Sequence, residues 1–500
     1  MKIFFNLITV LCSLLLATFV CAQQGYVFSP LRDDTVLKTK LLEAITNRYN
    51  NEKAALPKEF NKDLSSFYAS RYNSVKKYFD DSLVITDKEI NDYVQAVYAE
   101  IKRGNPALQK MDMHIMLCRA WWPNAACYGE GTILFNIGLF TRLHNEAEMA
   151  FVLCHELAHQ YFDHGNTAIR NYVQTVNSKE YQERLKEIQN TQYEKRRQVE
   201  DLLKSVSFSS RRHGREHESQ ADSMALVWLQ NTPYNPNAAI TCLGMLDAAD
   251  KDKYDVTINP KDFFNFSEYP FQKSWEKEEE SFFSKMAKAQ EAENKVMADS
   301  LKTHPDCKKR IAYLQKYMPA SAGGRYFVIS DTLLFEQRKL RFDYEILDYT
   351  ANHNFVSYSI YYSMQIQKAL GENVYLITNQ GTCLNKMYTA QLNHQLSKIV
   401  DMPSSDNEEK YNDFLQFIQK LRLADIGAFS YYYLRQKSAS YSGDRNFMAA
   451  FNLQWPGPLP GSGHGPEPGA GRHRPPAHRE PAQGRGAALR AGPRPAPGGG

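Results

Sequence analysis

His155 and His159, four residues apart, are the side chains of this sequence best spaced to bind a metal ion together. On a helix, this spacing puts both imidazoles on one face, where they can bind a single ion. Neutral imidazole is a good ligand for zinc. Glu156, beside the first histidine, would contact a water molecule on that ion rather than the ion itself. The pattern predicts a catalytic zinc site; two helix histidines with structural partners are the alternative.

A tetrahedral catalytic zinc needs a third protein ligand and one open position. His164 follows His155 by nine residues without an intervening glycine, unlike the metzincin pattern, so we expect it to pack or hydrogen-bond nearby. Glu218 opens a second predicted helix and can point at the ion. Asp222, one turn further, can accept a hydrogen bond from a ligand imidazole and fix its orientation.

The elements that must position these residues have clear start and stop signals. Asn145 followed by Glu148 is typical of the start of a helix, here strongly apolar over 147–161. The other elements expected are helices over 86–101, 216–230 and 237–246, strands over 113–120 and 132–136, an exposed helical excursion over 170–215 and a charged helical segment over 275–302. The predicted fold class is α+β, mainly α, with a small sheet.

Several segments occur in one order that resembles a known family. They are Asn124-Ala125, the run 131–138, the run 145–159 ending in His-Glu-Leu-Ala-His, the run 215–222, and Thr303-His304-Pro305 through Arg310. Together they resemble the gluzincin metallopeptidase family that includes HtpX, the CAAX prenyl proteases and the periplasmic BepA-type peptidases. The likeness covers roughly residues 86–318.

The resemblance implies a role for particular residues. It implies one zinc ion per chain, bound by His155, His159 and Glu218, with Glu156 as the catalytic base. His304, in the family's His-Pro motif, would stabilise the oxyanion or occupy the metal's fourth position in a resting state.

The resemblance also implies a substrate cleft, lined by Asn124, Ala125, Ile133 and Phe135. We expect the strand over 132–136 to pair with extended substrate backbone, which favours unfolded or misassembled proteins as substrates. The chain lacks the internal transmembrane helices of HtpX and the CAAX proteases. It therefore looks more like the soluble periplasmic branch, in which a helical-repeat domain follows the peptidase domain.

Composition divides the chain into four parts. We expect a signal peptide over 1–22, a metallopeptidase domain over 23–322 with its core at 86–318, and an all-helical domain over 323–450 that resembles helix-pair (TPR-like) repeats. The Gly/Pro/Arg-rich tail, 451–500, is either a disordered segment or non-native sequence from a frame-shifted or joined reading. The second interpretation is favoured.

The N-terminus predicts export. Lys2 precedes a largely apolar run over 3–20, and the small residues before position 23 suit cleavage after Ala22. An uncleaved membrane anchor and a lipid on Cys21 are the alternatives. The expected location is the periplasm or cell envelope, with the protein soluble or peripherally associated with the membrane.

Charge and cysteine content exclude other classes. The net charge of +4 equals that of the region from Phe451 onward, so the rest is near neutral and nothing favours nucleic acid as a partner. Beyond Cys12 and Cys21, the remaining cysteines are too sparse for a disulfide scaffold. Cys118 and Cys127 flank turn residues, and a disulfide between them across a hairpin is a candidate.

The sequence as a whole predicts a zinc-dependent endopeptidase of the cell envelope that acts on polypeptide substrates in protein quality control. The alternative is a chaperone or scaffold whose zinc is structural and whose helical C-terminal domain does the binding. That domain is also where partners from the envelope would bind.

Overall fold

The computed structural model describes residues 28–191, 195–249, 251–276, 307–319, 323–404 and 407–453; among the side chains over 192–213 it describes only that of Gln198. The predicted signal peptide lies outside these ranges, as do the predicted helix beyond Glu276 and the tail from residue 454. Within the part of the chain that is described, no helix is both long and apolar enough to cross a bilayer.

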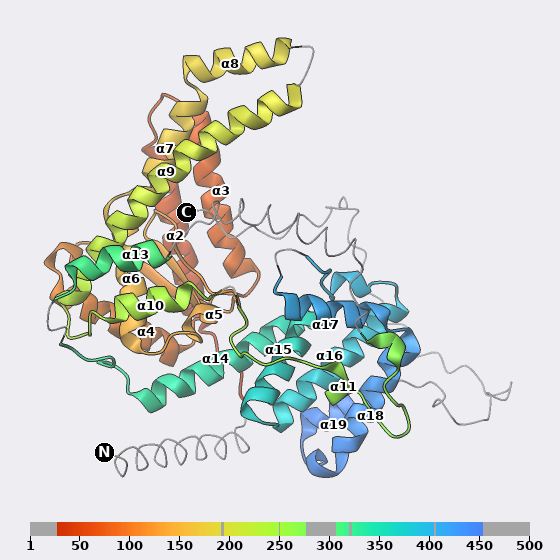
Figure 1. The fold of residues 1–500 in the computed structure, drawn as a ribbon. Coiled ribbons are helices and arrows are strands. Elements are labelled where there is room, and N and C mark those ends of the chain that lie inside the picture. The colour runs from red at the N-terminus through yellow and green to blue at the C-terminus, as the bar shows by residue number, and fades with distance from the viewer. Residues whose placement is uncertain are drawn as a thin grey trace.

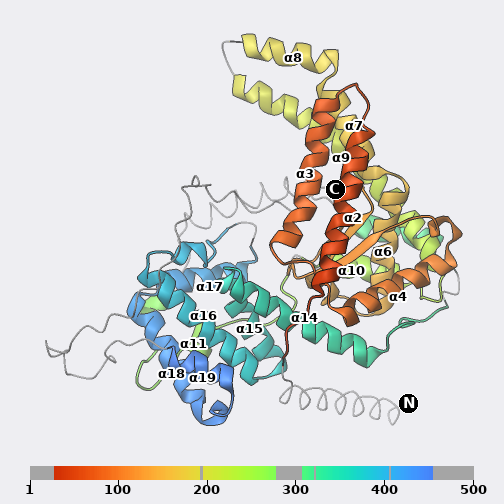
Figure 2. The ribbon, with the colours of Figure 1, turned by 180° about the vertical axis from the view of Figure 1, so that it is seen from behind.

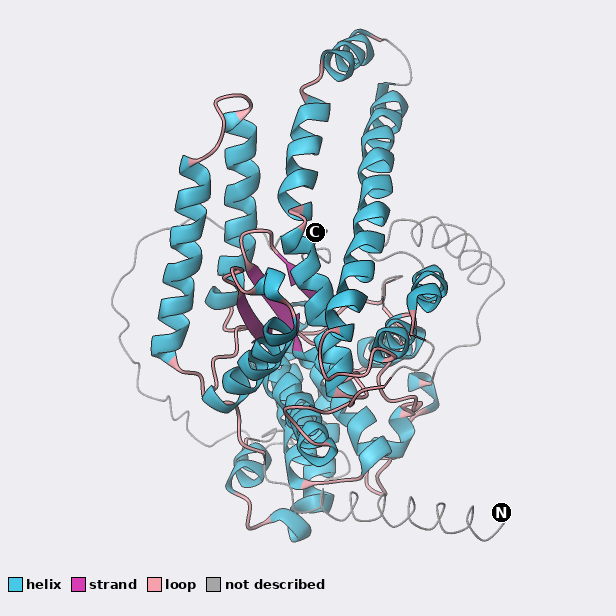
Figure 3. Cartoon of the chain, turned by 90° about the vertical axis from the view of Figure 1, so that its left-hand side faces the viewer, coloured by secondary structure: helices cyan, strands magenta, loops and turns pink. Residues whose placement is uncertain are grey.

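The architecture is mainly helical with one small sheet, which confirms the predicted fold class (Figures 1 and 3). The strands, the α-helices and the short 3₁₀ helices described up to residue 318 are α2 (Thr35–Ala54), α3 (Asn61–Asp80), α4 (Lys88–Gly104), η1 (Pro106–Leu108), β1 (His114–Cys118), β2 (Ala125–Cys127), β3 (Thr132–Asn136), α5 (Ile137–Phe140), α6 (Glu146–Tyr161), α7 (His164–Val176), α8 (Lys179–Asn190), α9 (Lys195–Gln230), α10 (Ala238–Leu246), α11 (Pro260–Phe263), η2 (Lys273–Trp275), α13 (Cys307–Leu314) and η3 (Gln315–Tyr317). Then follow α14 (Thr332–Asn352), α15 (Val356–Leu370), α16 (Val374–Leu392), α17 (Glu409–Lys420), α18 (Leu423–Tyr441) and α19 (Arg445–Asn452).

The sheet has the order β1-β3-β2, with β1 parallel and β2 antiparallel to β3. The short strand β2 was not predicted, and it makes β3 the central strand. The predicted disulfide is wrong: Cys118 lies opposite Asn136 and Cys127 opposite Ile133, on either side of β3, and both thiols are free. Two strand spacings alone put at least about 10 Å between the cysteines, beyond the roughly 7 Å between Cα atoms that a disulfide can bridge.

Helix α6 passes through the main hydrophobic core, and all its residues from Glu146 to Ala158 are buried. Asn145 caps it as expected, its side chain accepting a hydrogen bond from the Glu148 backbone N–H at 3.0 Å. The buried Glu146 carboxylate accepts from the Tyr234 hydroxyl and from three backbone N–H groups over 328–330. A helix held at its start in this way gives the residues of its last turns a fixed position.

A helical arm projects from this core (Figures 1 and 2). It consists of α7, α8 and the first half of α9, with α2 and α3 alongside its base. The arm corresponds to the helical excursion predicted over 170–215. Helix α9 runs from the arm into the core, where it packs against α6.

Helices α14–α19 form an all-α region, as predicted, and its second hydrophobic core is rich in aromatic rings. The segment 258–276, which we call the strap, lies in sequence within the predicted peptidase domain but packs into this second core through Phe264, Phe266 and Trp275. Conversely, α14 packs into the main core. The two regions thus exchange elements across the predicted boundary at 323, and α19 extends to Asn452, past the predicted start of the tail.

Candidate metal centre

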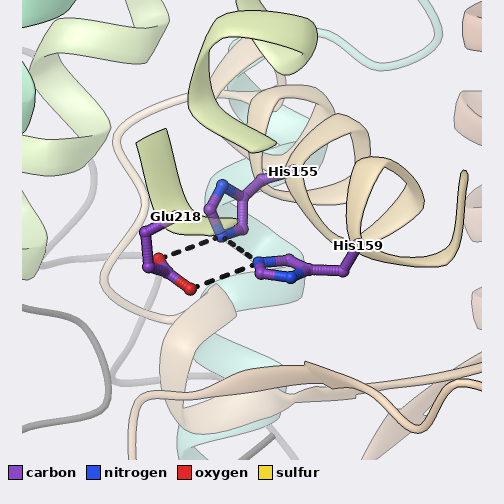
Figure 4. A group of neighbouring side chains, drawn as sticks. All are labelled: His155, His159 and Glu218. Carbon is purple, nitrogen blue, oxygen red and sulfur yellow. Dashed lines mark hydrogen bonds and ion pairs between the residues drawn. The ribbon is translucent and has the colours of Figure 1, made fainter. Parts of the chain in front are cut away.

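The last turns of α6 carry His155 and His159 side by side on one face (Figure 4). His155 is buried, with 5% of its surface exposed, and His159 is more accessible. Their Nε2 atoms lie 3.1 Å apart. The four-residue spacing on the helix therefore brings both imidazoles to one point, as the sequence predicted.

Glu218, from α9, completes the group. One of its carboxylate oxygens lies 3.5 Å from His155 Nε2 and the other 3.3 Å from His159 Nε2. In tetrahedral geometry, zinc bonds of about 2.0–2.2 Å would hold ligand atoms roughly 3.3–3.6 Å apart. The spacing and the donor types, two imidazoles and one carboxylate, therefore fit zinc. Within the described residues, this is the one such group of ligands.

Asp222 and Arg310 support the ligands from behind. Asp222 Oδ1 lies 3.0 Å from His155 Nδ1, the nitrogen that faces away from the metal position. Arg310, from α13, donates to both oxygens of Asp222 at 2.7 Å and lies 3.5 Å from Glu218. This chain of alternating charges lies behind His155, whose Nε2 faces the other ligands, and the predicted role of Asp222 in orienting that ring stays a prediction.

The charges shift the pKa values of these buried groups. Burial by itself would lower the pKa of His155, but the carboxylates of Glu218 and Asp222 outweigh it and raise the pKa to about 10. Burial would raise the pKa of Asp222, but Arg310 and His155 outweigh it and hold the pKa below its ordinary value. The carboxylates thus favour the protonated form of His155, and Arg310 and His155 favour the ionised form of Asp222.

Residues 85–318 match the family described as Peptidase family M48. The domain that carries the metal centre belongs to this peptidase family. No curated protein matches the chain. Peptidases of family M48 are zinc-dependent metallopeptidases, in agreement with the ligand set described above.

His164 of the M48 domain is not one of the residues that could bind the metal. Its Nδ1 lies 3.0 Å from Nδ1 of His159 and its Nε2 lies 3.0 Å from Gln220 Oε1. Burial lowers its pKa to about 4. The expectation that His164 hydrogen-bonds near the site is thus met, and the partner is the far nitrogen of a ligand histidine.

Glu156 is buried, with 5% of its surface exposed, and lies close to β2. Its charge acts on the Cys127 thiol, whose pKa is raised first by burial and then by Glu156. The next turn of α6 holds the loop after β2, because Gln160 accepts from Gly131 N–H at 3.0 Å and donates to Gly129 O at 3.2 Å. Both glycines have positive φ, which side-chain-bearing residues rarely adopt. The M48 domain therefore holds β2 beside Glu156.

The predicted substrate-binding residues are divided by the sheet topology. Ile133 and Phe135 are 0% exposed, so the prediction that their side chains line a cleft is wrong. β3 also cannot pair with a substrate, since both of its edges already carry a strand. Asn124 and Ala125 belong instead to β2 and the residue before it. Among the described residues no strand pairs with the edge of β2 that faces away from β3, and we call this the free edge of β2. Asn124 is half-buried, and its carbonyl accepts from the Asn136 N–H at 3.0 Å.

Sequence reasoning missed some functional neighbours. His304 lies outside the described residues, so the prediction about its role stays a prediction. Arg310 was part of the motif over 303–310, but no role was assigned to it. A buried Asp222 needs a cation nearby, and this requirement could have pointed to Arg310 as its partner. Nothing in the spacing pointed to Gln220 or Gln160.

Proposed function

We propose that this chain is an exported zinc metalloendopeptidase of the cell envelope that cleaves unfolded or misassembled polypeptides. One zinc ion per chain would be bound by His155, His159 and Glu218. The observation that carries the proposal is that these three residues, which come from two helices, bring their ligand atoms within 3.1–3.5 Å of one another. Glu156 follows the first ligand directly in the sequence. The charged start and apolar run of residues 2–20 support export.

The residues of the site divide the chemistry among them. Zinc, when bound, supplies Lewis acidity and lowers the pKa of a water molecule from 15.7 to about 7. Glu156 accepts a proton as water attacks the peptide carbonyl and donates it to the leaving amine nitrogen. Asp222 and Arg310 hold His155 in the orientation that presents Nε2 to the ion.

The free edge of β2 is the surface proposed to bind substrate backbone. Asn124 accepts from Asn136, and Tyr128 N–H donates to Thr132 O at 2.9 Å, so both point toward β3. In an antiparallel pair the backbone groups alternate, so those of Ala125 and Cys127 point away from β3. An extended polypeptide can add a strand there through its backbone alone, beside Glu156. Such binding needs an unfolded segment and little side-chain selection.

Substitution of Glu156 by Gln tests the function. The amide keeps the shape of the side chain but cannot accept the proton, so cleavage of a denatured protein should fall by roughly 10²–10⁴-fold. Zinc content, measured by metal analysis of the purified full chain, should stay at one ion. His353→Phe, an exposed change directly after the end of α14, is the control. Full cleavage by the Glu156→Gln protein would remove Glu156 from the mechanism.

The state of the substrate tests the specificity. A reference protein should be cleaved much faster after reduction and denaturation than in its folded form. Equal rates would contradict selection through backbone pairing. If zinc binds but neither form is cleaved, the alternative of a chaperone or scaffold with structural zinc replaces the peptidase. Fractionation of the producing cells tests the location, and a cytoplasmic pool alone would contradict export.

A further inference from the structure

The two ligand histidines have different partners on the nitrogens that face away from the metal position. His155 has the carboxylate of Asp222 at 3.0 Å, a charge that Arg310 balances. His159 has a neutral ring instead, because its Nδ1 faces His164 Nδ1 at 3.0 Å. The usual partner of a ligand histidine is a carboxylate, a backbone carbonyl or water, so an imidazole partner for His159 is unusual.

The positions of the protons follow from the need for a donor and an acceptor in each hydrogen bond. To bind a metal through Nε2, His159 must carry its proton on Nδ1, and His164 Nδ1 must then accept it. A neutral imidazole has one donor and one acceptor nitrogen, so His164 then carries its own proton on Nε2. That proton faces Gln220 Oε1 at 3.0 Å, an oxygen that can only accept.

The opposite arrangement fails at both ends. If His164 carried its proton on Nδ1, two acceptor atoms, the nitrogen His164 Nε2 and the oxygen Gln220 Oε1, would face each other across 3.0 Å unless the amide turned over. His159 would also carry its proton on Nε2, where the metal must bind. Gln220 thus selects the tautomer of His164, and His164 selects that of His159.

The surroundings hold the His164 ring in place for this task. The ring stacks on that of His217, with 4.0 Å between ring centroids and 9° between ring planes, and on that of Phe162, with 5.5 Å and 21° for the same two measures. It begins α7 directly after Asp163, whose φ of 55° turns the chain between α6 and α7. Gln220 lies on α9, the helix that also carries Glu218, so one helix fixes both the third ligand and the end of this chain of hydrogen bonds.

We infer that His164, oriented by Gln220, is a positioning residue that sets the tautomer and ring orientation of His159 for zinc binding. The inference rests on the proposed metal site, but not on the reaction catalysed there. It makes the centre asymmetric: a carboxylate and arginine support one ligand histidine, and an imidazole and amide support the other.

Direct observation of the protons is the first test. In the zinc-loaded full-length protein, long-range ¹H–¹⁵N correlation spectra should place the proton of His159 on Nδ1 and that of His164 on Nε2. A proton on Nδ1 of His164 would overturn the inference. This readout does not involve catalysis, so a failure of the proposed peptidase activity leaves it interpretable.

Substitution is the second test. His164→Phe keeps a flat ring for stacking but removes the acceptor, and zinc affinity, measured by competition with a chelator, should fall by roughly 10–100-fold. His164→Asn offers an oxygen near the position of Nδ1 and should recover most of that loss. A role in packing alone predicts the reverse order, with Phe tolerated and Asn harmful, and that result would overturn the inference.

Gln220→Leu tests the outer partner and guards against misfolding of the His164 variants, because Gln220 is exposed. It should weaken zinc binding by less than His164→Phe does, while the melting temperature of the zinc-free protein stays that of the parent. His353→Phe, directly after the end of α14 and outside the metal centre, is the matched control for the His→Phe change. Unchanged zinc affinity in both His164→Phe and Gln220→Leu would also overturn the inference.

Discussion

The metal centre and the aromatic core of the helical region are both buried, but for different physical reasons. At the centre each buried charge faces an opposite one, as Arg310 faces Asp222 at 2.7 Å. The helical core is built from contacts between aromatic rings, such as Phe264 stacked on Phe429 with 4.8 Å between ring centroids and 8° between ring planes. Charges and lone pairs must match in type, whereas an apolar core accepts many sequences of similar volume. The first region therefore indicates a reaction, and the second indicates only a fold.

Removal of a charge from the metal centre should have the largest effect on stability. Arg310→Met removes the guanidinium that faces the buried carboxylates of Asp222 and Glu218, which should cost about 3–5 kcal/mol. Urea unfolding with a chelator present measures this loss. Arg435→Met is the control, because its contact with Glu268 is half-exposed and should contribute less than about 1 kcal/mol. Equal effects of the two changes would remove the contrast between paired buried charges and surface ones.

Loss of a ring from the helical core should be comparable in free energy but confined to that region. Phe264 is 1% exposed, and its replacement by Ala should cost about 3 kcal/mol, near the lower end for Phe because neighbouring rings can shift into the space. Hydrogen exchange should rise over the strap and α18, while zinc affinity stays unchanged. The half-buried neighbour Phe263 supplies the control, Phe263→Ala. Loss of zinc affinity in Phe264→Ala would show that the two regions are coupled.

The same contrast explains which parts of the structure the sequence predicts. The His155–His159 spacing and the Asn145 cap are local, so the ligand pair and the start of α6 follow from short-range rules. The order of strands in the sheet depends on the three-residue strand β2, too short to give a periodic pattern. Its omission led to the wrong disulfide and to the wrong strand for substrate pairing.

Long-range packing accounts for the other differences. The strap carries aromatic residues without a helical or strand period, so nothing local indicates that it belongs to the core of a region that follows it in the chain. Arg310 is likewise separated from Asp222 by 88 residues. A sequence pattern fixes which residue types lie on one face of one element, but not which distant element covers that face.

Titration of a carboxyl pair near the strap should have the smallest effect and gives the last comparison. Glu408, which precedes α17, accepts from the Asp252 N–H at 2.8 Å, and Asp252 also accepts from the Tyr361 hydroxyl at 2.7 Å. Burial, followed by the nearby Asp252, raises the pKa of Glu408 from 4.5 to about 7, against the opposing effect of Lys410. The folded protein thus keeps a proton on Glu408 that the unfolded chain releases.

The sign of the pH dependence follows from this proton. With a raised pKa in the folded state, the contribution of Glu408 to stability is fully present below pH 4.5 and is lost as pH rises through about 7. Urea midpoints of Glu408→Gln should therefore fall less than those of the parent between these values, while the exposed Glu43→Gln follows the parent. Parallel curves for Glu408→Gln and the parent would show that the pair does not hold this proton. Zinc affinity should be the same in both proteins at each pH, because the pair faces the helical region and shares no hydrogen bond with the metal centre among the described residues.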